Sequence, residues 1–322
     1  MDPMREVLKE LSGQILERKK DLTRIDKNTR LSFLSTIGRK RKIERADEQI
    51  LEAVKEAGGL FAVDASYQRF GGASPHYLEL YQGLGLSSTG QTRPVMKTAA
   101  VSPLTQAGAG PDFRFGEQRS QEAEARLAAI ELETAKELVQ ENRGYALIMD
   151  GSLIRFQILC PKPWEELRTL CARLGLPIAG VIEDIKTDSI GRALQAAGHT
   201  RLLHYDREIL SGLLENGEIF VPKKEVSGKA ERGLSTLFAR FSGEPHVIGI
   251  DLDGDDEDSL VQLAAILYAI TPSHGRGVPY LLDVVDEKAR LAKRRTLETM
   301  KRSLDADVLE TYFISGRDRR KL

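Results

Sequence analysis

Two aspartates in this chain follow short apolar runs. Asp64 follows residues 60–63 and Asp150 follows residues 147–149, and in both cases a small residue and a serine come next. A carboxylate at the end of a buried strand, beside residues small enough to admit a backbone or a phosphate, is suited to bind a divalent cation. The two segments therefore predict a cation site that accepts phosphate groups.

A third carboxylate is expected from the helix predicted between these aspartates, at residues 118–141. Glu131 and Glu133 both lie at a distance from Asp150 that leaves room for the rest of the helix and a turn. Glu131 borders the apolar stripe of the helix, whereas Glu133 lies about 200° further round and is expected to face solvent. We favour Glu131 as the ligand, and the pattern leaves Glu133 open as the alternative.

Three carboxylates at one sheet edge repel each other unless a cation lies between them. Mg²⁺ and Mn²⁺ prefer oxygen ligands, retain water and bind phosphate. Two such ions about 3.5–4 Å apart can activate a water and stabilise a leaving 3′ oxygen, which predicts two-metal-ion hydrolysis of phosphodiesters. The competing interpretation is that Asp64 and Asp150 only end their strands in turns, as aspartate often does.

The order of the predicted elements indicates the fold class. Apolar runs and turn residues predict strands at 60–64, 77–81, 95–101, 145–150 (continuing to 154) and 178–182, with helices at 118–141 and 163–174. This order is that of an α/β, RNase H-like mixed sheet flanked by helices, in which the first and fourth strands lie side by side. Further helices are predicted at 5–57, 233–241 and 284–306. The expected division is a helical N-terminal extension at 1–57, a core at 58–290 and a C-terminal helix and tail at 291–322.

Composition excludes several classes of protein. The 322 residues carry a net charge of −1, which argues against a polycationic DNA-coating protein. Cys160 and Cys171 lack the spacing of a zinc site and are expected to be reduced core residues. With no apolar run near the ~20 residues that a bilayer needs, and no apolar leader, the protein is expected to be soluble and cytoplasmic, with no membrane partner.

Three segments resemble motifs of the NurA nuclease family. Residues 61–66 are similar to the first strand motif of that family, with Ala65 in place of its usual glycine. Residues 147–153 match the second strand motif closely, and residues 126–133 resemble the helix that supplies an acidic ligand. The resemblance covers roughly residues 58–290 and implies that Asp64, Glu131 and Asp150 are catalytic metal ligands.

Two later segments extend the resemblance. Residues 179–189 look like a strand that leads to a DNA-binding lysine, here Lys186, which would meet a phosphate. Residues 278–287 resemble the last motif, a tyrosine followed by a histidine that opens the final helix. Tyr280 matches that tyrosine, whereas Asp286 stands where the histidine is expected and would serve as a further metal ligand. By the same resemblance, the substrate contacts are Lys186 and Tyr280, together with Ser66 and Ser152 after the two aspartates.

The resemblance implies an activity and partners. The expected protein is a homodimeric, Mn²⁺- or Mg²⁺-dependent deoxyribonuclease, a 5′-to-3′ exonuclease and single-strand endonuclease. It would act on DNA in end resection and double-strand break repair with a HerA-type hexameric ATPase. One alternative is a catalytically inactive RNase H-like assembly subunit for a DNA-translocating ATPase, which would show no cleavage. Another is a ribonuclease that prefers RNA–DNA hybrids.

Overall fold

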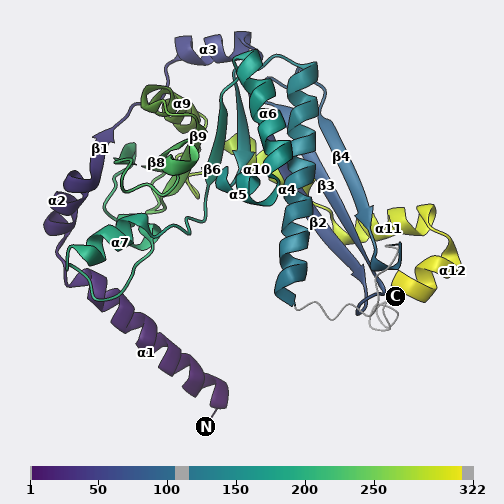
Figure 1. The fold of residues 1–322 in the computed structure, drawn as a ribbon, viewed down its shortest axis with the longest axis horizontal. Coiled ribbons are helices and arrows are strands. Elements are labelled where there is room, and N and C mark those ends of the chain that lie inside the picture. The colour runs from purple at the N-terminus through teal and green to yellow at the C-terminus, as the bar shows by residue number, and fades with distance from the viewer. Residues whose placement is uncertain (1, 106–115, 314–322) are drawn as a thin grey trace. The chain divides into compact units, whose positions relative to one another are not determined.

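The chain folds into two compact units, each built from segments that lie far apart in the sequence. The structure, a computed structural model, describes residues 2–105 and 116–313, apart from the side chains of residues 116–120 and 293. The first unit combines Met1–Ile50 with Gly180–Tyr280, and the second combines Leu51–Ala179 with Leu281–Leu322 (Figure 1). These units cut across the expected division at residues 57 and 290, because the N-terminal residues pack with the segment after residue 180.

The second unit is a mixed sheet with helices on both faces. Its strands run in the order β4-β3-β2-β5, with β2 antiparallel to β3 and parallel to β5. The elements are β2 (Leu60–Gly71), β3 (Tyr77–Ser87), β4 (Val95–Val101), η1 (Pro103–Thr105), α4 (Gly116–Glu141), β5 (Ala146–Asp150), α5 (Ile154–Leu159), α6 (Pro161–Leu174), α10 (Tyr280–Ala289), α11 (Lys293–Ser303), α12 (Ala306–Val308) and the π-helical turn η3 (Leu309–Phe313). α3 (Glu48–Glu56) and β6 (Ile178–Ile182) lie where the chain passes between the units.

Helix α4 lies close against β3 because a glycine opens the space. A side chain at Gly83 would collide with the Thr134 hydroxyl and would come within 3.1 Å of the Ile130 carbonyl. The helix buries its apolar stripe here, and Ala128, Ala135 and other small or aliphatic residues are fully buried. Alanine, leucine and glutamate dominate this segment and favour a helix. The close approach sets the distance between β3 and the part of α4 around Ile130 and Thr134, and Glu131 lies in that part.

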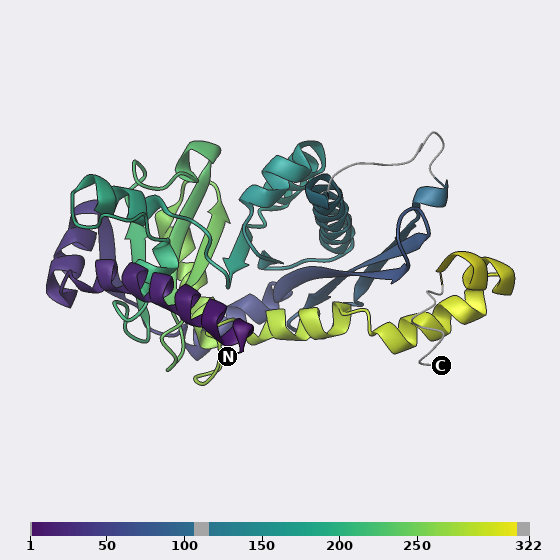
Figure 2. The same ribbon diagram turned by 90° about the horizontal axis from the view of Figure 1, so that it is seen from below.

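The C-terminal helices of the second unit cover the other face of the sheet. Figure 2 shows α10 and α11 below β2 and β3, and α4 above them. Met300 on α11 and Phe313 in η3 join a buried cluster with Phe70 of β2 and Leu78 of β3. The segment expected as a separate tail from residue 291 is therefore part of this unit as far as residue 313.

The first unit holds a four-stranded antiparallel sheet in the order β1-β7-β8-β9. Phe220 and Phe238 pair across two of its strands and pack into a cluster with residues of four helices, α1, α2, α7 and α8. Helix α9 packs against β8 and β9. The elements are α1 (Pro3–Thr23), α2 (Lys27–Ile37), β1 (Gly38–Lys42), α7 (Ser189–Ala196), α8 (Asp206–Leu210), β7 (Glu218–Pro222), η2 (Ala230–Arg232), β8 (Leu234–Arg240), β9 (Ile248–Asp253) and α9 (Glu257–Ala269).

Three local predictions are wrong. The basic run at 39–42 forms the edge strand β1 rather than part of a helix, since charged side chains suit a strand edge. The predicted helix at 233–241 is strand β8, whose serine, threonine and phenylalanine favour a strand and whose backbone pairs with β9. The strand expected to continue to residue 154 ends at Asp150, where Gly151 adopts a φ of +89° and turns the chain into α5.

In the part of the chain that the structure describes, no helix combines the length and the apolar character that crossing a membrane requires.

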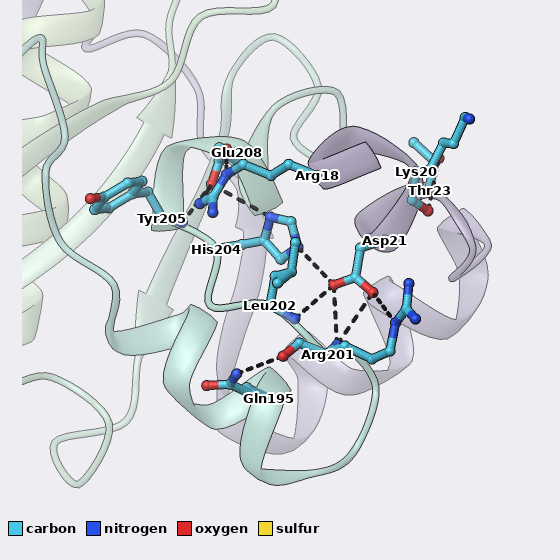
Figure 3. Close-up of polar contacts among 10 residues, drawn as sticks. All are labelled: Arg18, Lys20, Asp21, Thr23, Gln195, Arg201, Leu202, His204, Tyr205 and Glu208. Carbon is cyan, nitrogen blue, oxygen red and sulfur yellow. Dashed lines mark hydrogen bonds and ion pairs between the residues drawn. The ribbon is translucent and has the colours of Figure 1, made fainter. Parts of the chain in front are cut away.

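A buried carboxylate fastens α1 to the loop before α8. Asp21 is 3% exposed and accepts hydrogen bonds from the backbone amides of Arg201 (3.1 Å) and Leu202 (2.9 Å). The ring Nε2 of His204 lies 3.3 Å from the same carboxylate, as Figure 3 shows. Burial acts to raise the pKa of Asp21, but the hydrogen bonds from Leu202, His204 and Arg201 outweigh it and hold the pKa at about 2.

We predict that Asp21→Asn destabilises the protein by about 2 kcal/mol near neutral pH, the value of hydrogen bonds to a buried charged group. The pKa of Asp21 is depressed in the folded state, so its contribution is complete above the unfolded pKa near 4 and disappears as the pH falls through 2. Urea denaturation at pH 7 and at pH 2.5 checks this prediction. The difference in unfolding free energy between the wild type and the variant should be smaller at the lower pH.

Glu17→Gln is the matched control, because Glu17 lies on the same helix with its carboxylate on the surface beside Lys20. It should leave the unfolding free energy close to that of the wild type, as is usual for a surface substitution. If the difference in unfolding free energy between the wild type and Asp21→Asn stays constant down to pH 2.5, the depressed pKa assigned to Asp21 is wrong.

Candidate active site

Asp64 and Asp150 lie on neighbouring parallel strands of the second unit. β2 and β5 pair in register up to Val63 and Met149. The next residue on each strand is the aspartate, so the two carboxylates leave the sheet at the same level. The four residues before each aspartate are at most 2% exposed. The two strands thus hold the acids side by side on a closely packed apolar base.

The surroundings of Asp64 disfavour its charged form. Burial, followed by the negative charge of Asp150, raises the pKa of Asp64 to about 7, and Asp286 on α10 adds to this. The backbone amide of Ala65 and the guanidinium of Arg155 act in the opposite direction without cancelling the rise. The structure therefore brings three carboxylates from β2, β5 and α10 within range of mutual repulsion.

Glu131 brings a fourth carboxylate to this group from α4. Its side chain is 1% exposed, whereas Glu133 on the same helix faces solvent. Burial raises the pKa of Glu131 to about 8, and the charges of Asp64 and Asp150 also raise it, although Arg155 lowers it. The geometry therefore favours Glu131 over Glu133 as the acid that acts with the two strand aspartates.

Arg155 is a member of this group that the sequence analysis missed. It lies in the first turn of α5, and its Nη2 donates hydrogen bonds to Oε2 of Glu131 and to the carbonyl oxygen of Asp150, the latter at 3.0 Å. The guanidinium passes over Gly151, where an added Cβ would lie 3.7 Å from Arg155 Nε. The available signal was a basic residue about one turn after the Asp-Gly-Ser sequence.

The donor set fits a hard divalent cation. The group holds four carboxylates and the guanidinium of Arg155, and Asp286 also pairs with Arg290 at 2.8 Å. Burial, followed by the charges of neighbouring acids, raises the pKa values of Asp64 and Glu131 despite the presence of Arg155. Carboxylate oxygens are the ligands that Mg²⁺ and Mn²⁺ prefer. Within residues 2–105 and 116–313, no three acidic, histidine or cysteine side chains are placed so that they could hold a metal ion as they stand. Glu131 is directed at Arg155 instead, so a cation would have to compete for that carboxylate.

Ser66 fixes the helix that carries Asp286. Its hydroxyl donates to the carbonyl oxygen of Ala289 at 2.5 Å and accepts from the amide of Leu291 at 3.2 Å. Gln82 on β3 donates to the same Ala289 carbonyl at 3.1 Å. The serine predicted to contact substrate therefore binds the end of α10 and positions Asp286, three residues earlier.

The other predicted substrate contacts have different settings. Ser152 lies in the half-buried turn between β5 and α5, two residues after Asp150. Lys186 is exposed on the segment after β6, and Tyr280 begins α10 with 63% of its surface exposed; both belong to the first unit. Their contact with a substrate stays a prediction.

A buried acid in the first unit shows what a compensated carboxylate looks like. Asp251 is fully buried, and Nζ of Lys229 lies 2.7 and 2.9 Å from its two oxygens. The Thr236 hydroxyl donates a further hydrogen bond at 2.9 Å. This carboxylate has its own buried cation, which sets it apart from the group around Asp64.

Comparison with solved structures shows the fold. The NurA nuclease from Sulfolobus solfataricus matches 95% of this chain with 99% of its own length, at a TM-score of 0.58 and 11% identity. The catalytic domain of human endonuclease V matches 88% of this chain and 98% of its own length, at a TM-score of 0.42 and 14% identity. Endonuclease V from Bacillus subtilis is similar, with 85% and 91% covered, a TM-score of 0.41 and 14% identity. The prediction of an RNase H-like α/β fold is confirmed.

The sequence itself matches a family model. No curated protein matches the chain. The NurA domain, however, matches residues 50–291, three quarters of the sequence and nearly the span over which the motifs resemble that family. Since the match includes the strands and helices that carry all four carboxylates, this chain belongs to the NurA family.

Proposed function

We propose that this protein is a deoxyribonuclease that hydrolyses phosphodiester bonds with two divalent cations, Mn²⁺ or Mg²⁺. The observation that carries the proposal is the convergence of four carboxylates, from β2, α4, β5 and α10, on a site where the two buried acids, Asp64 and Glu131, have Arg155 as their shared cation. Membership of the NurA family and the fold shared with a NurA nuclease support the same chemistry. The site has the charge and the ligand type that this reaction requires.

The four acids have distinct supports in the proposed reaction. Asp64 and Asp150 would hold the cations from adjacent strands, Glu131 from the buried face of α4, and Asp286 from the helix that Ser66 anchors. Bound cations would supply activation of the attacking water and stabilisation of charge on the leaving oxygen. The apolar residues beneath the two aspartates exclude water from one side of the site. Lys186, Tyr280 and Ser152 are the proposed contacts to the DNA backbone.

Two departures from the family motifs leave the carboxylates in place. Ala65, where a glycine is usual, packs in a buried cluster with Tyr81 and Ile130. Asp286, where a histidine is expected, acts on Asp64 as a further negative charge. These contacts favour an active nuclease over the alternative of an inactive assembly subunit.

The wider role is proposed from the family. We propose 5′-to-3′ exonuclease and single-strand endonuclease activity in DNA end resection and double-strand break repair in the cytoplasm. The proposed assembly is a homodimer that works with a HerA-type hexameric ATPase. These proposals rest on membership of the NurA family.

We predict that Asp150→Asn lowers the rate of DNA cleavage by at least about 100-fold, because losing a cation ligand forfeits several kcal/mol of charge stabilisation. The assay follows end-labelled single- and double-stranded DNA with Mn²⁺, Mg²⁺ or EDTA. Cleavage by the wild type should require a divalent cation and should stop in EDTA.

Glu133→Gln is the matched control, since it removes an exposed carboxylate from the helix that carries Glu131. It should cleave within about twofold of the wild-type rate, as expected for a surface change away from the site, whereas Glu131→Gln should behave like Asp150→Asn. Cleavage by Asp150→Asn at the wild-type rate with Mn²⁺ would refute the proposed function.

A second prediction concerns stability without metal. The unfolded chain ionises Asp64 and Glu131 near pH 4, but the folded chain does so only near pH 7 to 8, so the folded state binds more protons between these values. In EDTA, the melting temperature should therefore fall between pH 5 and pH 8.5, by at least about 4 °C given about 1.4 kcal/mol per pKa unit and 2–4 °C per kcal/mol. Saturating Mn²⁺ should reverse the fall at pH 8.5, and calorimetry or thermal-shift measurements check both effects.

Glu131→Gln supplies the comparison for this measurement. Its uncharged amide removes one of the two titrating groups, so its melting temperature in EDTA should depend less on pH than that of the wild type. If the wild-type melting temperature rises from pH 5 to pH 8.5 in EDTA, the raised pKa values assigned to Asp64 and Glu131 are wrong.

A further inference from the structure

The contacts of Arg155 serve only part of its hydrogen-bonding capacity. A guanidinium carries five N–H donors in a planar fork. Nη2 contacts Glu131 and the Asp150 carbonyl, while Nε is buried and has no hydrogen-bond partner in the structure. The group also lies 4.6 Å over the ring of Phe156, and its side chain is 31% exposed. Arg155 is therefore held at the site with donors left over.

Glu131 depends on Arg155 for compensation of its charge. Among the residues that the structure describes, Arg155 is the cation that pairs with this fully buried carboxylate. A buried carboxylate left without a partner is strongly unfavourable. In the metal-free protein the guanidinium thus provides the positive charge that a cation would otherwise bring.

A divalent cation and Arg155 would compete for the carboxylate of Glu131. Arg155 contacts one of its two oxygens, Oε2, and a cation bound to the same carboxylate would repel the guanidinium and weaken that contact. The position of Arg155 permits a short displacement: its guanidinium lies over Gly151, which has no side chain to obstruct it, and about a third of the side chain already reaches solvent.

We propose that Arg155 exchanges partners during the reaction, binding Glu131 in the metal-free protein and a phosphate of the DNA substrate once a cation occupies the site. This inference rests on the proposed nuclease function and adds a substrate-binding residue to it. An arginine fork matches two phosphate oxygens in a bidentate contact. The unused donors of Arg155 are the ones that this contact would satisfy.

The first test measures competition without any cleavage. Thermal unfolding is followed in EDTA and in saturating Mg²⁺ for the wild type, Arg155→Gln and Arg168→Gln. Arg168 pairs with Glu165 on α6 of the same unit and provides a matched loss of charge. Arg155→Gln leaves Glu131 without its cation, so Mg²⁺ should raise its melting temperature by at least about 3 °C more than it raises that of the wild type. Arg168→Gln should respond like the wild type.

The second test measures DNA binding with Ca²⁺ in place of Mg²⁺, by fluorescence anisotropy on a labelled oligonucleotide. Arg155→Gln should bind about tenfold more weakly than the wild type, as expected for loss of a charge-assisted contact, and its salt dependence should fall by about one phosphate contact. Arg155→Lys keeps the charge but lacks the fork, so it should respond to Mg²⁺ like the wild type and still bind DNA more weakly. This variant also decides the phosphate contact if Arg155→Gln does not fold.

The possible outcomes distinguish failure of the Arg155 proposal from failure of the proposed nuclease function. A Mg²⁺-induced rise in Arg155→Gln no larger than in the wild type overturns the competition. Wild-type DNA affinity in Arg155→Lys overturns the phosphate contact. If Mg²⁺ and Mn²⁺ leave the wild-type melting temperature unchanged and support no cleavage, the proposed function itself fails.

Discussion

The central constraint in this structure is negative charge that is removed from water without enough positive charge to balance it. Asp64 and Glu131 are buried to 8% and 1% exposure, and their pKa values rise to about 7 and 8. Burial alone would penalise either ion, and the nearby Asp150 increases the penalty for both. Such an arrangement is costly for an isolated fold, and the divalent cation proposed for this site would reduce that cost.

Other buried acids of the protein are balanced by the fold itself. Glu79 accepts from Arg69 at 3.0 Å and from the Tyr81 hydroxyl at 2.8 Å. Asp251 pairs with Lys229. Asp21 accepts hydrogen bonds from two backbone amides and lies next to the ring of His204. These carboxylates stabilise strands, helices and loops locally. The group around Asp64 differs because its two buried acids, Asp64 and Glu131, lie near Asp150 and share Arg155, and both keep raised pKa values. This is the electrostatic basis for treating the group as the functional site.

The scaffold brings this charge together through backbone pairing and close packing. The register of β2 and β5 places the two aspartates side by side, Gly83 lets α4 approach the sheet, and Ser66 with Gln82 holds the end of α10. Each of these contacts fixes the position of the backbone. A rigid backbone is what holds side chains of like charge close together despite their repulsion. The last contact also explains how a residue more than two hundred positions after Asp64 joins the same site.

The sequence by itself determined the parts that depend on local pattern. The apolar runs before Asp64 and Asp150, the long helix with Glu131 on its apolar side and the strand at 178–182 were all readable, because burial imposes a periodicity on each element. The tertiary structure decided which acids meet, that Ser66 binds a helix end, and that the basic run at 39–42 is an edge strand paired with β7. It also revealed Arg155, whose partner Glu131 lies on a different helix. These outcomes depend on contacts between distant segments, and a local pattern carries no information about which distant residue will lie opposite.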